Sequence, residues 1–357
     1  MWLAVSFTVC FLTGLISHLI QHPAGWFWWP SRPVSLYRVT QGLHVISGIA
    51  SIPLLLAKLW SVFPKLFGRP LVKSLPHALE RLSILVLSAS AFFELTTGLL
   101  NVAQNYPWNF YFPQVHYAVA WVAIGSIGVH IAVKLPVIRR ALSKQAKDTP
   151  EPEPVPARTA AGLSRRGFLR TTWVASGVAV VATAGATVPL LRNVSGLSWR
   201  SDKGPQGLPV NRTAAAAGVL DKANDPAWRL SIVTPAGTRT FSLAELRAMP
   251  QTTAELPIAC VEGWSQSAQW RGISLPALLR ATGSKPGVSL RVTSLERGGL
   301  YAVTELPGEH TEDELTLLAL ELNGEVLDMD HGFPCRIIAP NRPGVLQTKW
   351  VTRLEAL

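Results

Sequence analysis

Long hydrophobic runs separated by short polar stretches dominate the first part of the chain. The runs lie at about 2–20, 36–60, 80–101 and 115–138. Each is close to the roughly twenty apolar residues that a helix needs to cross a bilayer, so the pattern predicts four membrane-spanning helices. The first run begins at Met1 with no polar residues before it, which leaves open whether this start is truncated.

The hydrophobic pattern stops at residue 140, and residues 1–140 therefore form the first predicted domain. Residues 141–163 are rich in Lys, Glu and Pro and are expected to form a solvated cytoplasmic linker. The segment 164–192 opens with Ser164-Arg-Arg-Gly-Phe-Leu-Arg170 and continues as an Ala/Val-rich apolar stretch to Leu191. It predicts a fifth apolar segment.

From residue 193 onward, short apolar runs with strand-like alternation predict a mixed α+β domain at 193–357. A helix is expected after Ser242, which is a plausible N-cap, and a second where Leu275, Leu278 and Leu279 recur with helical spacing. Asn323-Gly324 predicts a tight turn. The expected strands lie at 228–233, 256–260 and 288–294, with a strand end at Thr240 and a further apolar segment at 315–322. The segments 336–340 and 349–357 complete the domain.

The composition and charge support a membrane protein. Hydrophobic residues make up 48% of the chain and charged residues only 15%, with a formal net charge of +11. The positive charges flank the apolar runs, so the positive-inside rule explains them and a nucleic-acid partner is not expected. Basic loops follow the second and fourth runs, at Lys58, Lys65, Arg69, Lys73, Lys134, Arg139, Arg140, Lys144 and Lys147.

This charge distribution predicts a multi-pass protein of the plasma membrane, in contact with lipid, whose N-terminus is cytoplasmic. The loops without basic clusters then lie outside, where Trp26, Trp28, Trp29 and Trp108 are expected to form an interfacial belt.

The twin arginines Arg165 and Arg166 before an apolar segment are typical of the address of the Tat exporter. Tat moves folded proteins, so the domain at 193–357 would be delivered outside with its cofactor already bound. The alternative is an ordinary fifth span with a basic stop, which also places that domain outside the cytoplasm.

Histidines in the apolar runs are candidate haem ligands, because a histidine in hydrocarbon is costly. His116 and His130 are fourteen residues apart, which returns to almost the same helix face about 21 Å along the axis. That spacing suits two haem irons across a bilayer. His44 lies on the second run, and His18, on the first, competes for the outer haem.

A weak internal repeat relates the two hairpins, since Thr13-Gly-Leu leads on to His44 and Thr97-Gly-Leu to His116. We therefore expect His44 and His116 to bind one haem together. The part resembles the four-helix cytochrome b subunits of membrane oxidoreductases, such as the formate dehydrogenase gamma subunit. The resemblance implies one or two haem b groups on His44, His116 and His130, and quinone as a partner. The alternatives are that these histidines are structural, and that Glu94 is a hydrogen-bonded side chain rather than a quinol proton acceptor.

Of the three cysteines, Cys10 lies in an apolar run, so no disulfide framework is expected. Cys260 ends a predicted strand. As a bare pattern, it is equally a small buried hydrophobe or a nucleophile or soft-metal ligand.

Three separated motifs carry a second resemblance. They are Cys260-Val-Glu-Gly-Trp-Ser with Trp270-Arg-Gly, then Asp328-Met-Asp-His331-Gly-Phe-Pro-Cys-Arg336, then Thr348-Lys349-Trp-Val. Residues 205–357 resemble the molybdopterin domain of the sulfite oxidase superfamily. The resemblance implies a molybdenum ion held by the pterin dithiolene and by the Cys260 thiolate, which would be the catalytic centre.

The same resemblance implies which residues bind the pterin. Arg336 would hold its phosphate bidentately and His331 would lie beside it. Lys349, Gln347 and Thr348 would line the phosphate, and Ser294 would add a polar contact. Cys335 precedes Arg336, so strand alternation turns it away from the pterin and into the core.

The segment after Cys260 departs from sulfite oxidases, because no arginine follows until Arg271. A clustered cationic sulfite pocket is therefore not expected. The Cys-Val-Glu sequence is closer to the catalytic subunits of periplasmic protein-methionine-sulfoxide reductases. The residues between Trp264 and Trp270 are interpreted as a turn that forms the wall of a substrate funnel.

Together these features predict a membrane-anchored molybdenum oxidoreductase that links quinone and haem b to oxygen-atom transfer, in the direction of S- or N-oxide reduction. Its substrate would be a small molecule or an oxidised side chain. One alternative runs the other way, oxidising a small sulfur or other substrate and delivering electrons to quinone. Another is a non-catalytic, membrane-anchored binding module.

Overall fold

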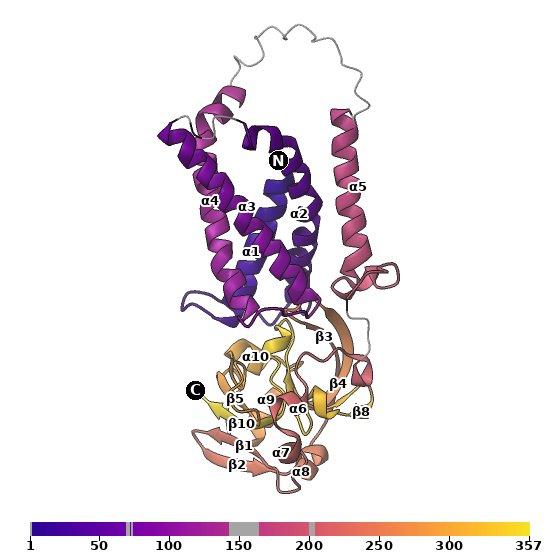
Figure 1. Ribbon diagram of the computed structural model, residues 1–357. Helices are drawn as coiled ribbons and strands as arrows, with labels where there is room; N and C mark the ends of the chain where they lie inside the picture. The colour runs from indigo at the N-terminus through magenta and orange to yellow at the C-terminus, as the bar shows by residue number, and fades with distance from the viewer. Residues whose placement is uncertain (1, 69–71, 73, 143–163, 200–203) are drawn as a thin grey trace. The chain divides into compact units, whose positions relative to one another are not determined.

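A computed structural model describes residues 2–68, 72, 74–142, 164–199 and 204–357 (Figure 1). The chain divides into two compact units. The helical unit comprises Met1–Gly14 and His44–Ala182, and the α+β unit comprises Leu15–Leu43 and Thr183–Leu357. The α+β unit thus includes the end of the first helix, the loop after it and the start of the second helix. Most of the predicted linker, 143–163, lies outside the described residues.

Four long apolar helices form where the hydrophobic runs predicted them. Each has the length and composition to cross a membrane, which indicates a membrane protein. They extend beyond the predicted spans, because polar and basic residues at their ends continue the helical hydrogen bonding. Their bounds are α1 Trp2–Gln21, α2 Leu36–Leu66, α3 Leu75–Val102 and α4 Phe112–Leu142.

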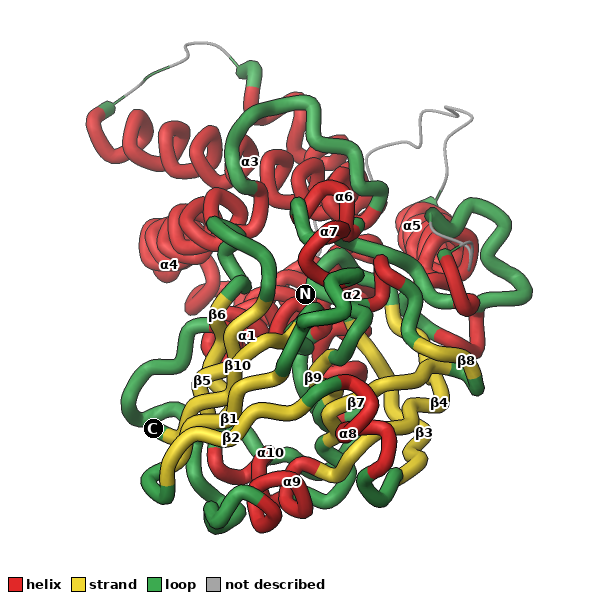
Figure 2. The backbone as a smooth tube through the Cα atoms, turned by 90° about the horizontal axis from the view of Figure 1, so that it is seen from below, coloured by secondary structure: helices red, strands yellow, loops and turns green. Residues whose placement is uncertain are grey.

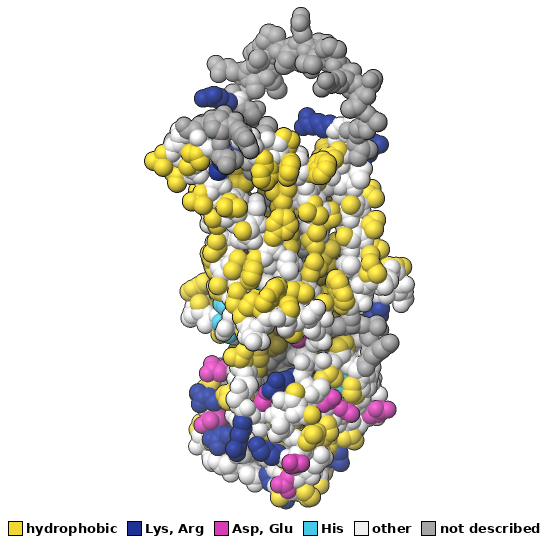
Figure 3. Space-filling view, in the orientation of Figure 1, with side chains coloured by type: hydrophobic (Ala, Val, Ile, Leu, Met, Phe, Trp, Pro, Cys, Tyr) yellow, Lys and Arg dark blue, Asp and Glu magenta, His cyan; other side chains and the backbone are white. Residues whose placement is uncertain are grey.

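On the face shown in Figure 3, many of the side chains over these helices are hydrophobic. Within the helical unit, α3 packs along α4, and Lys134 pairs with Glu80 between them. Such an apolar outer surface is what lipid would contact.

Helix α5, Arg165–Thr183, follows the twin-arginine motif. It is not among the described helices that are apolar enough to cross a membrane, since three arginines lie in its first six residues. The Ser176 hydroxyl donates to the carbonyl of Ala50 on α2 at 3.1 Å. After Thr183 the chain forms two short 3-10 helices, η2 Ala184–Ala186 and η3 Pro189–Leu191. The role of this segment as a Tat signal or fifth span stays a prediction.

The α+β unit contains two five-stranded sheets (Figure 2). The first has the order β2-β1-β10-β5-β6, in which β1 and β10 are parallel and the other pairs antiparallel. The second has the order β3-β4-β7-β8, with β9 also pairing with β7. The bounds are β1 Leu230–Thr234, β2 Gly237–Phe241, β3 Thr252–Ala259, β4 Ser265–Ser274, β5 Leu290–Ser294, β6 Val303–Leu306, β7 Leu317–Leu322, β8 Glu325–Val326, β9 Arg336–Ile338 and β10 Val351–Ala356.

Short helices connect these strands. The Ser242 side chain accepts from the backbone N–H of Glu245, and the Glu245 carboxylate accepts from the Ser242 N–H, so the predicted N-cap is a capping box. The connecting helices are α6 Ala214–Ala217, α7 Leu220–Ala223, α8 Leu243–Ala248, α9 Leu275–Ala281 and α10 Gly308–Glu312, with 3-10 helices η4 Pro205–Gly207, η5 Met329–His331 and η6 Gly344–Leu346.

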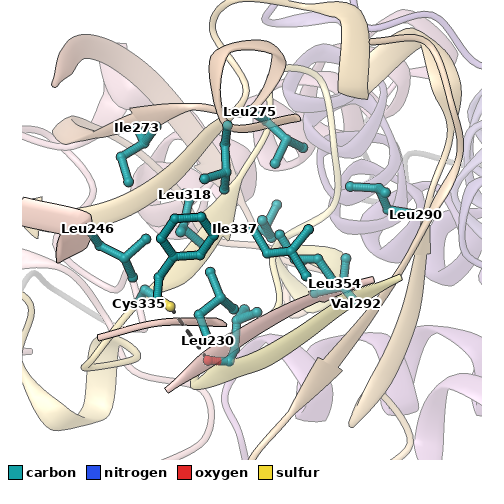
Figure 4. Close-up of a cluster of buried hydrophobic side chains, with 14 of the residues drawn as sticks. Leu230, Leu246, Ile273, Leu275, Leu290, Val292, Leu318, Cys335, Ile337 and Leu354 are labelled. Carbon is teal, nitrogen blue, oxygen red and sulfur yellow. Dashed lines mark hydrogen bonds between the residues drawn. The ribbon is translucent and has the colours of Figure 1, made fainter. Parts of the chain in front are cut away.

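The main core is formed by side chains from both sheets and from α9 (Figure 4). Leu230 and Leu354 come from one sheet, and Leu318 and Ile337 from the other. Cys335 is fully buried among them, as strand alternation predicted, and burial raises the pKa of its thiol.

The interpretation of residues 264–270 as a turn is wrong. Residues 265–274 form strand β4, which pairs with β3 on one side and β7 on the other. Trp270 is fully buried and Trp264 is 4% exposed. The polar residues 265–269 form a strand because β3 pairs with their backbone groups, and β7 pairs with the strand only from Trp270 onward. Neither tryptophan forms an open funnel wall.

Candidate functional site

Cys260 lies immediately after β3, at the predicted strand end. Its N–H donates to the carbonyl of Trp264 at 2.8 Å, and its own carbonyl accepts from the N–H of Gly263 at 3.0 Å. Gly263 has φ +86°, a conformation that favours glycine. The thiol is buried and donates to the carboxylate of Glu262 at 3.5 Å. We call residues 260–264 the Cys260 turn.

The loop that follows β9 packs against this turn. Ala259 and Pro343 form a parallel bridge. A Cβ atom added at Gly344 would lie 3.3 Å from the Ala259 carbonyl oxygen and 3.5 Å from the Cα of Cys260. This loop leads into residues 347–349, so the motif that contains Thr348 and Lys349 follows a loop that packs against the Cys260 turn.

Arg336 is the buried cation of the site. Its Nη1 donates to the His331 carbonyl at 3.0 Å and its Nη2 to the Gln347 carbonyl at 3.1 Å. The guanidinium lies 5.0 Å from the centre of the Trp270 ring. Its Nε is buried without a hydrogen-bond partner, and burial lowers the pKa of Arg336 to about 9. A buried donor of this kind has the chemistry to bind an anionic group.

His331 and Lys349 lie beside Arg336. A Cβ atom added at Gly332, where φ is +110°, would lie 3.1 Å from the Cβ atoms of both Arg336 and Lys349. Nε2 of His331 donates to the Pro205 carbonyl at 2.7 Å. Burial and the Arg336 charge lower the pKa of His331 to about 4, so the ring is neutral at pH 7.

Lys349 links this group to the Cys260 turn electrostatically. Its Nζ donates to the carbonyls of Arg212 at 2.6 Å and Asp330 at 2.9 Å. Burial, followed by the Arg336 charge, lowers the pKa of Lys349 to about 7, while Asp330 and Cys260 act in the opposite direction. The structure thus brings His331, Arg336 and Lys349 together, and Cys260 acts to raise the pKa of Lys349.

Three other predicted site residues already have partners within the unit. The Gln347 side chain bonds both backbone groups of Ala339, at 2.7 and 2.8 Å. The Thr348 hydroxyl bonds that of Thr304 at 2.7 Å, and the Ser294 hydroxyl donates to the Lys349 carbonyl at 2.8 Å. These side chains shape the loop, and their predicted contacts to the pterin stay predictions.

In the helical unit, the rings of His44 and His116 are adjacent, with centroids 6.2 Å apart. Nδ1 of His44 donates to the Cys10 carbonyl at 2.8 Å, and Nδ1 of His116 bonds the Thr97 hydroxyl at 2.9 Å. A ring with its proton on Nδ1 keeps the Nε2 lone pair, which is what an iron ligand needs.

Each of these histidines lies against the glycine of its Thr-Gly-Leu sequence. A Cβ atom at Gly14 would lie 2.9 Å from Cε1 of His44, and one at Gly98 would lie 3.7 Å from Cε1 of His116. The structure therefore reproduces the sequence repeat. In one respect it does not fit a haem: a Glu94 oxygen lies 3.1 Å from Nε2 of His116, and would have to leave that nitrogen for iron to bind.

The other predicted haem ligands have different surroundings. His130 has a buried Nδ1 without a hydrogen-bond partner. His18 belongs to the α+β unit, where its ring lies 4.9 Å from that of His22. Within the described residues, no three His, Cys, Asp or Glu side chains gather as a site for a metal ion. This does not bear on the predicted centres, because the molybdenum centre needs only one thiolate from the protein and the haem only two imidazoles.

Sequence reasoning missed the contribution of the loop between α1 and α2 to the α+β unit. Trp29 donates to the Asn341 carbonyl at 2.9 Å, and Trp28 donates to Glu309 at 2.6 Å. The interfacial-belt interpretation had assigned these tryptophans to lipid only. A loop rich in Trp and Pro with a single charged residue, Arg32, was the available signal, but it does not identify the partner.

Residues 217–357 match the family model of the oxidoreductase molybdopterin binding domain. The match contains Cys260, His331, Arg336 and Lys349, and confirms the predicted fold class of this part of the chain.

The chain is also similar to proteins that are named as an oxidase, an oxidoreductase and a reductase subunit. It is 28% identical over 159 residues to mitochondrial sulfite oxidase of Drosophila melanogaster, covering 37% of this chain and 27% of the relative. It is 30% identical over 116 residues to the oxidoreductase YuiH of Bacillus subtilis (32% and 57%). It is 26% identical over 114 residues to the putative protein-methionine-sulfoxide reductase subunit YedZ1 of Azospira oryzae (32% and 42%). The alignments thus cover between about a quarter and just over half of these relatives.

The residues of the molybdopterin domain fit the cofactor that its family name implies. The buried Cys260 thiol is a soft ligand suited to molybdenum. The unpartnered Nε of Arg336 and the cation Lys349 suit an anionic pterin phosphate. Neutral His331 adds no charge of its own at pH 7.

Proposed function

We propose that the protein is a membrane-bound molybdenum-cofactor oxidoreductase that couples the quinone pool, through haem b, to oxygen-atom transfer. The observation that carries the proposal is a buried Cys260 thiol in the same region as the buried group of Arg336, His331 and Lys349, a region that matches the oxidoreductase molybdopterin binding domain. The same chain has four apolar helices, and their adjacent pair, His44 and His116, supports the haem.

Each protein side chain has a defined task in this proposal. Cys260 holds molybdenum through its thiolate, and Arg336, Lys349 and His331 bind and orient the pterin. The bound cofactor supplies two-electron oxygen-atom exchange with the substrate. Gly263 allows the conformation of the Cys260 turn, and Gly344, in the loop after β9, allows the backbone to approach Cys260 closely.

His44 and His116 hold a haem b that supplies one-electron transfer, and Glu94 accepts a proton from quinol. His130 is the candidate ligand for a second, deeper haem. The protein lies in the plasma membrane, with its molybdopterin domain outside and a Tat address at Arg165–Arg166. Arg165, Arg166 and Arg170, at the start of α5, support this orientation.

The proposed direction is reduction of an S- or N-oxide. Quinol gives two electrons and two protons and becomes quinone, while the oxide takes two electrons and two protons and becomes the sulfide or amine plus water. Similarity to a putative protein-methionine-sulfoxide reductase subunit supports this direction. Similarity to a sulfite oxidase supports the reverse one, in which a small sulfur substrate is oxidised and quinone is reduced.

Metal and haem analysis of the purified full chain, followed by a redox titration, tests the proposal. We expect molybdenum, a b-type spectrum that quinol reduces, and reoxidation by methionine sulfoxide or trimethylamine N-oxide. Haem reduction by sulfite instead would establish the reverse direction. A chain without molybdenum would contradict the oxidoreductase proposal and support the non-catalytic binding module.

A further inference from the structure

The loop between α1 and α2 and the first residues of α2 form a segment that is bonded into the molybdopterin domain. We call residues 28–41 the docking segment; they belong to the same compact unit as that domain. Arg32 forms a bidentate pair with Asp313, at 2.8 and 2.9 Å. Burial would raise the pKa of Asp313, but hydrogen bonds from Arg32 and from the N–H of Leu315 hold it below its ordinary value.

Asn341 is the centre of this attachment. Its Oδ1 accepts from the N–H of Tyr37 at 2.6 Å, in the first turn of α2, and its Nδ2 donates to the Pro30 carbonyl at 2.6 Å. Its backbone N–H donates to the Val34 carbonyl at 3.2 Å, and its carbonyl accepts from Trp29 at 2.9 Å. Asn341 is 2% exposed and has φ +54°. It thus makes four hydrogen bonds to residues about 300 positions earlier in the chain.

The docking segment reaches both sides of Cys260. The buried ring of Tyr37 packs in one cluster with Ala259, the residue before the cysteine, and with Leu346. Nε2 of Gln41 donates to the carbonyl of Val261, the residue after it, at 3.4 Å. Gln41 is buried and lies one helical turn after Tyr37.

Arg38 extends the contact to the strand that follows the Cys260 turn. Its Nε donates to the Ser265 hydroxyl at 2.7 Å and its Nη2 to that of Ser267 at 2.9 Å. The docking segment therefore contacts the chain before, within and after the turn that presents the thiol.

We propose that the docking segment positions the Cys260 turn, with Tyr37 and Gln41 as positioning residues and Asn341 as their anchor. Contacts from the docking segment to the residues on both sides of Cys260 restrain the backbone of the turn and so fix the direction of the thiol. Because the docking segment joins two apolar helices, the site is complete only in the full chain. The inference rests on the proposed function for the role of Cys260 as a ligand, but not for the contacts themselves.

The experiment compares Asn341→Gly with Asn323→Gly in the purified full chain by hydrogen–deuterium exchange. Glycine tolerates the positive φ of both positions, +54° and +50°, so the change removes side-chain bonds without backbone strain. Asn323 is the matched control, since its side chain bonds Gln206 and Gln269 instead of the docking segment.

We expect Asn341→Gly to speed exchange at least about tenfold both in peptides from 29–41 and in peptides from 257–265. Asn323→Gly should leave both regions unchanged. Faster exchange in 29–41 alone would overturn the proposal, because the segment would then dock without holding the turn. No change in either region would also overturn it.

Tyr37→Phe, which keeps the ring and removes the hydroxyl, gives a kinetic test of positioning. With reduced viologen as donor and methionine sulfoxide as substrate, Asn341→Gly and Gln41→Leu should lower kcat about tenfold or more with KM unchanged, and Tyr37→Phe should lower it less. Unchanged kcat in all three would count against positioning. If the wild-type protein lacks turnover but the two asparagine variants show the expected difference in exchange, the proposed function is wrong and the inferred docking still holds.

Discussion

Nη1 of Arg336 donates a 3.0 Å hydrogen bond to the carbonyl oxygen of His331, five residues earlier. This bond links the two ends of the segment 331–336 and restrains the guanidinium. The Nε atom of Arg336 is buried and has no hydrogen-bond partner. The position of the cation is thus set by the backbone of the motif itself. The adjacent Trp270 ring completes the enclosure on another side.

Arg336→Lys should therefore lower the molybdopterin content of the full chain. Lysine keeps a charge but not the planar fork, so the charge-assisted bonds to phosphate and to two carbonyls are lost, and affinity should fall about ten- to hundredfold. Pterin fluorescence of the denatured, oxidised protein measures the content. Arg271→Lys is the control, because Arg271 is an exposed residue paired with Glu321 at 2.7 Å. Equal pterin content in both variants would disprove the role of Arg336.

His44→Leu and His116→Leu should each remove the b-type spectrum of the full chain. The two rings are adjacent, and an iron held by both loses an axial ligand in either variant. His77→Leu is the control, since His77 lies at the start of α3. Visible absorption of the dithionite-reduced protein gives the answer, and an unchanged Soret band in both test variants would refute the pair as ligands.

Gly14→Ala and Gly98→Ala should differ although they occupy equivalent places in the repeat. A Cβ atom at Gly14 would lie 2.9 Å from the His44 ring, so that ring must move; one at Gly98 would lie at 3.7 Å from the His116 ring, which is an ordinary contact. We expect Gly14→Ala to lower haem occupancy or shift the spectrum and Gly98→Ala to leave both unchanged. Equal spectra would show that the His44 ring is not held against α1.

His310→Leu should make the molybdopterin domain less sensitive to acid. His310 is 2% exposed and neither ring nitrogen has a well-formed hydrogen bond; burial and then the Arg342 charge lower its pKa to about 3. The unfolded state takes up a proton below about pH 6.5, so this contribution is present above that pH and is lost as pH falls towards 3.

The loss amounts to about 1.4 kcal/mol of unfolding free energy per pH unit between roughly pH 6 and pH 4. Thermal unfolding of the full chain at pH 7.5, 6 and 4.5 measures it. Above pH 6.5 the Tm of wild type and that of His310→Leu should change with pH in the same way. Below pH 6.5 the Tm of the variant should fall less than that of wild type. Parallel curves over the whole range would contradict a buried neutral histidine.

Local patterns predicted much of the fold because they depend on neighbouring residues. The four apolar helices, the Ser242 cap and the buried Cys335 followed from hydrophobic spacing, capping chemistry and strand alternation. The place of Cys260 at a strand end followed from the apolar run before it. The family match to residues 217–357 then confirmed the interpretation of this part.

The docking segment escaped prediction because its partners are distant in sequence. Asn341 and Pro30 are separated by 311 positions, and no periodicity connects an asparagine in one loop to carbonyls in another. Strand β4 was missed for a related reason: its polar residues 265–269 resemble a turn, and only pairing with β3 makes them a strand. Tertiary hydrogen bonds override local pattern at both places.

The most direct test of the account is the molybdenum content of the Cys260→Ser chain, measured by elemental analysis per mole of protein. Cys335→Ser is the matched control, since it changes the other buried cysteine of the domain, which lies in the core. We predict that Cys260→Ser loses molybdenum, and its turnover, at least about 100-fold, whereas Cys335→Ser loses stability but keeps its molybdenum. Full molybdenum content and full activity in Cys260→Ser would contradict the account.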